Sequence, residues 1–138
     1  MLRALERLKE KYPDRMEIVI AENVPFEQYC EMMNHSDVLL DQLYSYTPAM
    51  NALLAMAKGL VVVGGGEPEN YDILHEEELH PIINVLPNEE DVYEKLRWVA
   101  LHSDRIPELS RQSIEYIRRH HDHVKVAREY LDFWRAND

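Results

Sequence analysis

With 138 residues, the chain is long enough to form one domain with a buried core that needs neither disulfides nor metals. Its 46% hydrophobic and 30% charged residues are typical of a soluble globular protein, and the net charge of -11 argues against a protein that binds a nucleic-acid backbone. A local basic pocket can still hold a small phosphorylated ligand. The single cysteine, Cys30, leaves no internal disulfide and indicates a reducing, cytoplasmic setting. No membrane-spanning run or signal-peptide pattern is present.

Helix and strand patterns alternate along the chain. In chain order, we expect a helix over 1–12, a strand over 16–20, a helix from Pro25, a strand over 37–41, a helix over 48–58, a strand over 60–63, a strand over 82–86, and helices from Asn88, from 107 and from Asp122. Gly59 is placed to cap the C-terminus of the 48–58 helix, and Asn88 and Asp122 are suitable N-caps.

The strands are separated by helices and are apolar on both faces, which predicts a parallel sheet covered on both sides. The predicted fold class is therefore α/β: a Rossmann-like parallel sheet of about four strands with helices on both faces, forming a single domain over 1–138. Ligands bind such sheets beyond the carboxyl ends of the strands. This directs attention to the loops at 21–25, 41–48 and 64–72.

The loop at 41–48 leads into a helix whose start can bind an anion. Thr47 is expected to cap the helix and Pro48 to occupy its first position. The free N–H groups of Ala49, Met50 and Asn51 would then point beyond the sheet, where the helix dipole favours a negative charge. An ordinary capped core helix explains the same spacing equally well.

Gly64-Gly65-Gly66 follows a strand and permits close approaches that side chains would forbid. The spacing is not that of a dinucleotide-binding motif, and a flexible turn explains it more readily when it is taken alone. Glu67 and Glu69 lie just beyond and can accept hydrogen bonds from sugar hydroxyls, although solvated loop acids are the simpler interpretation.

Other reactive residues give weaker signals. His120, His121 and His123 lie at a junction between two predicted helices, where a solvated junction is favoured over a metal site. Cys30 lies on an apolar helix face and is expected to be a buried small hydrophobe. No arrangement typical of a nucleophile and its base is present, so the sequence identifies no catalytic residue.

Three segments together resemble the retaining, "group 1" glycosyltransferases of GT-B fold. These are Ser36–Leu40, Ala55–Val63 and Gly65–Glu69, of which Ala55–Val63 is the most specific. Asn23–Tyr29 resembles the family's preceding helix, so the likeness covers nearly the whole chain. The resemblance implies an enzyme with two Rossmann-like halves that transfers a sugar from a nucleotide-sugar donor to an acceptor in glycan or polysaccharide biosynthesis.

In that family the C-terminal half holds the donor, and this chain resembles that half. The resemblance implies that Thr47, Pro48, Ala49 and Met50, with Asn51 beside them, hold the donor diphosphate. Residues expected near the donor sugar or nucleotide are Tyr44, Tyr46, Leu54, Gly65, Gly66 and Glu67. No cofactor is implied beyond the nucleotide-diphosphate sugar, which is a co-substrate, and neither a metal nor a nucleic-acid partner is expected.

The chain departs from the family in two respects. The family's two glutamates fall on Tyr46 and Leu54, neither of which is acidic, and this favours a second hypothesis: a glycosyltransferase-like binding or scaffold module without catalysis. A phosphoacceptor domain built on Asp41 is disfavoured, because the acidic pair and lysine that it needs are missing.

The second departure is that the chain opens inside the helix after the family's first strand. The resemblance thus implies an N-terminally truncated domain whose missing N-terminal half is its natural partner. The fragment alone is expected to lack turnover and to self-associate through an uncovered sheet edge.

Overall fold

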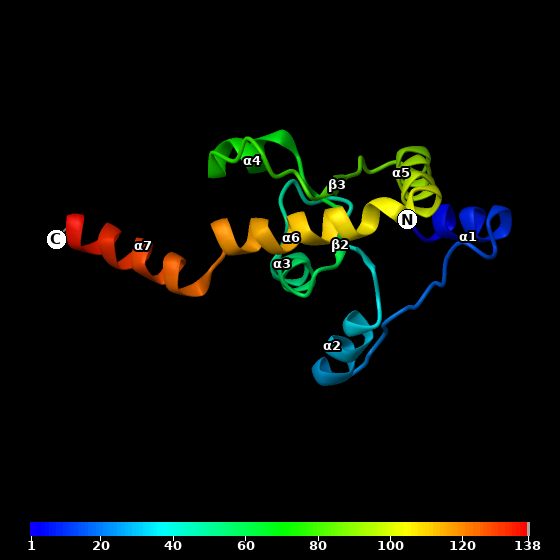
Figure 1. The fold of residues 1–138 in the computed structure, drawn as a ribbon, viewed down its shortest axis with the longest axis horizontal. Helices are drawn as coiled ribbons and strands as arrows, with labels where there is room; N and C mark the ends of the chain where they lie inside the picture. Colours follow the sequence, from blue (N-terminus) through cyan, green and yellow to red (C-terminus); the bar gives the residue numbers. More distant parts are fainter. Residues whose placement is uncertain (138) are drawn as a thin grey trace.

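The computed structural model of the protein describes residues 1–137 as a mixed α/β domain (Figure 1). In chain order its elements are α1 (Leu2–Lys11), α2 (Phe26–Asn34), β1 (Val38–Leu40), α3 (Met50–Ala57), β2 (Val61–Gly64), α4 (Pro68–Leu74), β3 (Ile83–Asn84), α5 (Glu89–Leu101), the 3-10 turn η1 (Ser103–Arg105), α6 (Ile106–His120) and α7 (His123–Ala136). None of the helices in the described part is long and apolar enough to cross a membrane.

The sheet is parallel, as the sequence predicted, with β2 between β1 and β3. Val38 lies opposite Val61 in the first pair, and Val63 lies opposite Ile83 in the second. The side chains of β2 are fully buried because helices cover both faces of the sheet. Val63 faces a core with α1 and α5, whereas Val62 faces a core with α3 and Tyr116 of α6.

The strand expected over 16–20 is absent from the described residues, where an irregular connection joins α1 to α2. Val19 and Ile20 remain 58% and 60% exposed. A strand needs a hydrogen-bonded neighbour, and within residues 1–137 β1 pairs only with β2. The β-branched residues of this segment favour an extended backbone, but no adjacent strand in the described part of the chain forms hydrogen bonds with it.

Most of the predicted helix boundaries are confirmed. Gly59 has a φ of 87°, and the N–H groups of Gly59 and Leu60 donate to the carbonyls of Met56 and Ala55, which is the hydrogen-bond pattern of a Schellman cap. Asn88 accepts a hydrogen bond from Asp91 N–H at 2.8 Å, and Asp122 caps α7 in the same way.

Three features differ from the expectations. Pro68–Leu74, expected as part of a loop, forms α4, because Pro68 is well suited to a first helical position. Cys30 is only half-buried, since α2 contacts the core chiefly through Met33. The helix over His123–Ala136 forms, but it projects from the end of α6 and buries no residue, so that Trp134 is 59% exposed (Figure 1).

A buried ion pair joins the connection after α4 to the end of α6. The Glu76 side chain is 3% exposed and accepts hydrogen bonds from the backbone N–H groups of Glu78 and Leu79. His120 Nε2 lies 2.6 Å from its carboxylate, and Arg119 lies 3.4 Å away. Burial by itself would raise the pKa of Glu76, but the hydrogen bonds from His120, Leu79 and Glu78 and the charge of Arg119 together lower it to about 2.

We expect Glu76→Gln to lower the free energy of unfolding at pH 7 by about 1.5–3 kcal/mol, the range for hydrogen bonds to a charged group. Because the folded pKa lies below the ordinary value of 4.5, this stabilisation is complete above pH 4.5 and is lost as the pH falls toward 2. The difference between wild type and variant should therefore close over that window in urea unfolding curves. Glu77→Gln, at an exposed neighbouring position, is the matched control. A constant difference from pH 7 to pH 2 would contradict this assignment.

Candidate functional site

 The start of α3 lies beyond the carboxyl ends of β1 and β2. Ala49 has an extended backbone (φ -90°, ψ 178°), and the helix begins at Met50 with no side-chain cap. The first helical hydrogen bond joins Leu53 N–H to the Ala49 carbonyl at 3.0 Å. The N–H groups of Met50, Asn51 and Ala52 therefore have no acceptor within the helix.

This start differs from the predicted one by two residues. Thr47 does not cap the helix and Pro48 is not its first residue. Instead, the Ser45 hydroxyl donates to the Thr47 carbonyl at 2.5 Å and fixes the loop before the helix begins. The N-cap residue is an alanine, whose side chain cannot accept a hydrogen bond from the first-turn N–H groups.

The loops after β1 and β2 pack directly on one another, and the glycines make this possible. Glu67 N–H donates to the Tyr46 carbonyl at 3.2 Å, and a Cβ atom on Gly65 would overlap the Ser45 carbonyl oxygen. A Cβ on Gly66 would lie 2.7 Å from Ile82, while the Gly66 N–H donates to Asn84 at 3.0 Å. Gly65 and Gly66 are buried, so this turn is packed rather than open.

The predicted residues near the donor divide into exposed and inward-facing groups. Tyr44, Tyr46 and Met50 are 85%, 77% and 80% exposed around the helix start. Leu54 packs against the core formed with α6, and Glu67 lies half-buried at the start of α4. The structure thus brings the tyrosines and Met50 to the same region as the free N–H groups, and it turns Leu54 toward the interior.

Asp41 joins this region although the sequence indicated no binding role for it. Its side chain is 9% exposed, and its Oδ1 accepts a hydrogen bond from Asn51 Nδ2 at 3.4 Å. Asn51 Oδ1 in turn accepts one from the Tyr29 hydroxyl at 2.7 Å. The signal in the sequence was an aspartate placed directly after a continuous apolar strand.

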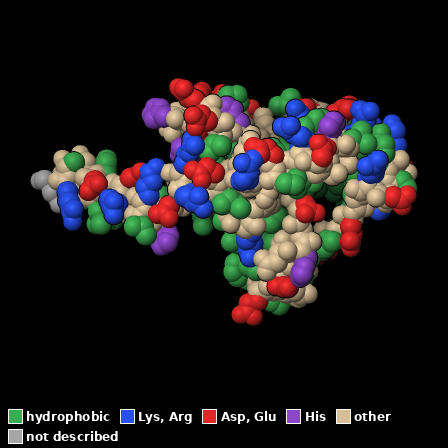
Figure 2. All heavy atoms as spheres, in the orientation of Figure 1, with side chains coloured by type: hydrophobic (Ala, Val, Ile, Leu, Met, Phe, Trp, Pro, Cys, Tyr) green, Lys and Arg blue, Asp and Glu red, His purple; other side chains and the backbone are tan. Residues whose placement is uncertain are grey.

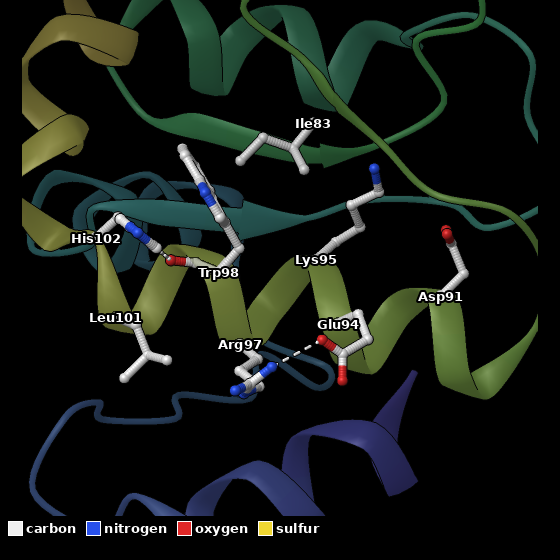
Figure 3. Close-up of a pocket in the computed structure, with 8 residues that line it drawn as sticks. All are labelled: Ile83, Asp91, Glu94, Lys95, Arg97, Trp98, Leu101 and His102. Atoms are coloured by element: carbon white, nitrogen blue, oxygen red, sulfur yellow. Dashed lines mark hydrogen bonds and ion pairs between the residues drawn. The ribbon is translucent and has the colours of Figure 1, made fainter.

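A concave region lies along α5, on the other face of the sheet from α3 (Figure 3). It is an open groove of about 610 Å³ lined by Ile83, Asp91, Glu94, Lys95, Arg97, Trp98, Leu101 and His102. Lys95 and Trp98 point toward Ile83, and the Trp98 ring stacks on His102 with their centres 4.9 Å apart. Glu94 and Arg97 pair at 3.0 Å, so the charges of this groove are partly neutralised within α5.

The charged side chains are dispersed over the surface. On the face drawn in Figure 2, acidic and basic residues are interspersed along the body and along α7. Among the described residues, no three His, Cys, Asp or Glu side chains are grouped to hold a metal ion. The histidine junction has a structural role, since His120 pairs with Glu76.

A parallel sheet with helices on both faces and loops gathered at its carboxyl edge defines the chain as a Rossmann-like α/β domain. The sequence profile of the family described as "Glycosyl transferase-like" matches residues 1–132. The chain therefore belongs to this glycosyl transferase-like family. Comparisons with curated proteins and with solved structures gave no match.

Proposed function

We propose that this chain is the donor-binding half of a GT-B glycosyltransferase of the group 1, retaining type. The enzyme would transfer a sugar from a nucleotide-sugar donor to an acceptor in glycan or polysaccharide biosynthesis, in the cytoplasm. Family membership supports the reaction class. The observation that carries the donor-binding role is the uncapped start of α3, with three N–H groups beyond the carboxyl edge of the sheet.

The chemistry of that helix start suits a diphosphate. Backbone N–H groups at a helix N-terminus donate hydrogen bonds to phosphate oxygens, and the helix dipole adds about 0.3–1 kcal/mol, rising to about 2 in partly buried geometry. The packed loops at Ser45 and Gly65 hold this start in place. The exposed rings of Tyr44 and Tyr46 provide apolar surface beside it for the rest of the donor.

The proposed enzyme has a second, N-terminal half that would close over the donor and supply the acceptor site. This chain alone would then bind a nucleotide sugar weakly and would not turn it over. The unpaired outer edge of β1 and the exposed Val19 and Ile20 also favour self-association of the isolated chain. Light scattering at rising concentration tests that part, and a monomer throughout would contradict it.

A ligand-observed NMR titration with UDP, GDP and ADP tests the donor-binding role. We expect one of them to bind with a Kd on the order of 1 mM, which corresponds to about 4 kcal/mol. Inorganic sulfate should compete, because it would occupy the same N–H groups. If none of the three nucleotides binds at 10 mM, this chain has no donor site of its own.

An alternative function is that of a glycosyltransferase-like binding or scaffold module without catalysis, and it is favoured by Leu54. Its side chain faces the core and has no group that accepts a ribose hydrogen bond, and Tyr46 carries no carboxylate. Calorimetric titration of the longer protein with nucleotide sugars, followed by an assay for sugar release or transfer, separates the two functions. Binding with turnover supports the enzyme, whereas absence of both supports the scaffold.

A further inference from the structure

The side-chain amide of Asn51 is held between two groups from different elements. The Tyr29 hydroxyl, on α2, donates to its Oδ1 at 2.7 Å. Its Nδ2 donates to the carboxyl of Asp41, at the end of β1, at 3.4 Å. With the Tyr29 hydroxyl donating to Oδ1 and Nδ2 donating to Asp41, the NH2 group of Asn51 faces Asp41 and its oxygen faces Tyr29. The amide thus has one defined orientation in the first turn of α3.

Burial of the Asp41 carboxyl group disfavours the folded state, and strand pairing in the sheet does not require that group. Its Oδ2 is buried and has no hydrogen-bond partner, which disfavours the folded state. Asp41 bonds to the sheet through its backbone N–H, which donates to the Val63 carbonyl at 2.9 Å. Any residue except proline would provide that bond. Gly64 leaves room for the carboxyl, since a Cβ there would lie 3.0 Å from Asp41 Cβ.

We propose that Asp41 and Tyr29 are positioning residues that hold the Asn51 amide as a side-chain donor to the phosphate bound at the start of α3. The inference rests on the proposed function and adds residues to its site. The Nδ2 group carries two hydrogens, of which Asp41 takes one. The other is free for a phosphate oxygen beside the N–H groups of Met50 and Asn51. Asp41 itself stays buried behind the amide and acts through it.

The test is a double-mutant cycle that measures the Kd for inorganic pyrophosphate by NMR titration. Asp41→Ala and Tyr29→Phe should each weaken binding about fivefold, the effect of losing one ordinary hydrogen bond. Asp41→Asn retains an acceptor oxygen and should keep most of the wild-type affinity for pyrophosphate. In an Asn51→Ala background, neither Asp41→Ala nor Tyr29→Phe should have a further effect, because the residue through which they act is gone.

The controls are chemically matched and distant from the site. Asp37→Ala is at the other end of β1, and Tyr130→Phe is on the exposed α7; both should leave the Kd unchanged. Equal fold-changes of the Asp41 and Tyr29 variants with and without Asn51 would overturn the inference, as would unchanged affinity in both single variants. If Asp41→Ala fails to fold, the Tyr29→Phe cycle decides, since that change removes one oxygen atom.

The inference and the proposed function can fail separately. Wild-type protein that binds neither pyrophosphate nor any of the three nucleotides would remove both. Wild-type binding with shifted Met50, Asn51 and Ala52 amides, but with no response to the Asp41 and Tyr29 variants, would overturn only the positioning role and leave the donor site intact.

Discussion

Replacing Ala49 by aspartate is expected to stabilise the protein and to weaken its binding of pyrophosphate more than tenfold. Ala49 occupies the N-cap position, where aspartate accepts hydrogen bonds from the first-turn N–H groups and adds about 1 kcal/mol of stability. The same carboxylate would occupy the N–H groups of Asn51 and Ala52 and place a negative charge where the diphosphate would lie. We therefore expect a higher melting temperature together with affinity more than tenfold lower, measured by thermal unfolding and NMR titration.

Two further variants separate the effects of charge and capping. Ala49→Asn caps the helix without the charge, so it should stabilise similarly and weaken binding less than Ala49→Asp. Ala21→Asp adds the charge at an exposed position of the connection between α1 and α2, and should leave both properties nearly unchanged. If Ala49→Asp binds pyrophosphate as well as wild type, the anion does not bind at the start of α3.

The Gly65→Ala substitution should cause the largest loss of stability among glycine-to-alanine changes in this fold. The added methyl group would overlap the backbone carbonyl of Ser45, which a change of side-chain rotamer cannot relieve. Overpacking of this kind costs about 1–3 kcal/mol or more, and here it must separate the loops after β1 and β2. Urea unfolding measures the loss, and weaker pyrophosphate binding should accompany it because Ser45 fixes the loop before α3.

Gly64→Ala provides the comparison at a neighbouring glycine. Its methyl group would lie 3.0 Å from Asp41 Cβ and 3.6 Å from the nearest backbone atoms, so the loss of stability should be smaller. Equal stability of wild type and Gly65→Ala would show that the two loops are not packed as described.

The sequence predicted the elements that pack against adjacent strands or helices in the structure. The apolar run Val61–Val63 and the capping residues Gly59 and Asn88 all behave as expected, because local pattern and tertiary packing agree there. The segment 16–20 shows the limit, since strand composition does not form a strand without an adjacent strand to bond. The start of α3 shows a second limit, because the helix begins two residues later than expected and has no side-chain cap, while Ser45 donates a hydrogen bond to the Thr47 carbonyl.

The candidate site was only partly predictable for a related reason. Ala49, Met50 and Asn51 follow from helix geometry, and the need for Gly65 follows from close loop packing. The link from Asp41 to Asn51 and Tyr29 joins three elements that are distant in sequence, so no spacing rule reveals it. In the same way, the burial of Glu76 against His120 depends on the docking of α6 and not on the local Glu76–Glu78 run.

Protein-observed NMR with pyrophosphate tests the central claim most directly, because it locates the anion residue by residue. The claim predicts that the backbone amide signals of Met50, Asn51 and Ala52 shift most in an isotope-labelled sample, with smaller shifts at Ser45 and Gly65. Shifts that gather instead on the α5 groove, at Lys95 and Trp98, or no shift at saturating pyrophosphate, would contradict it.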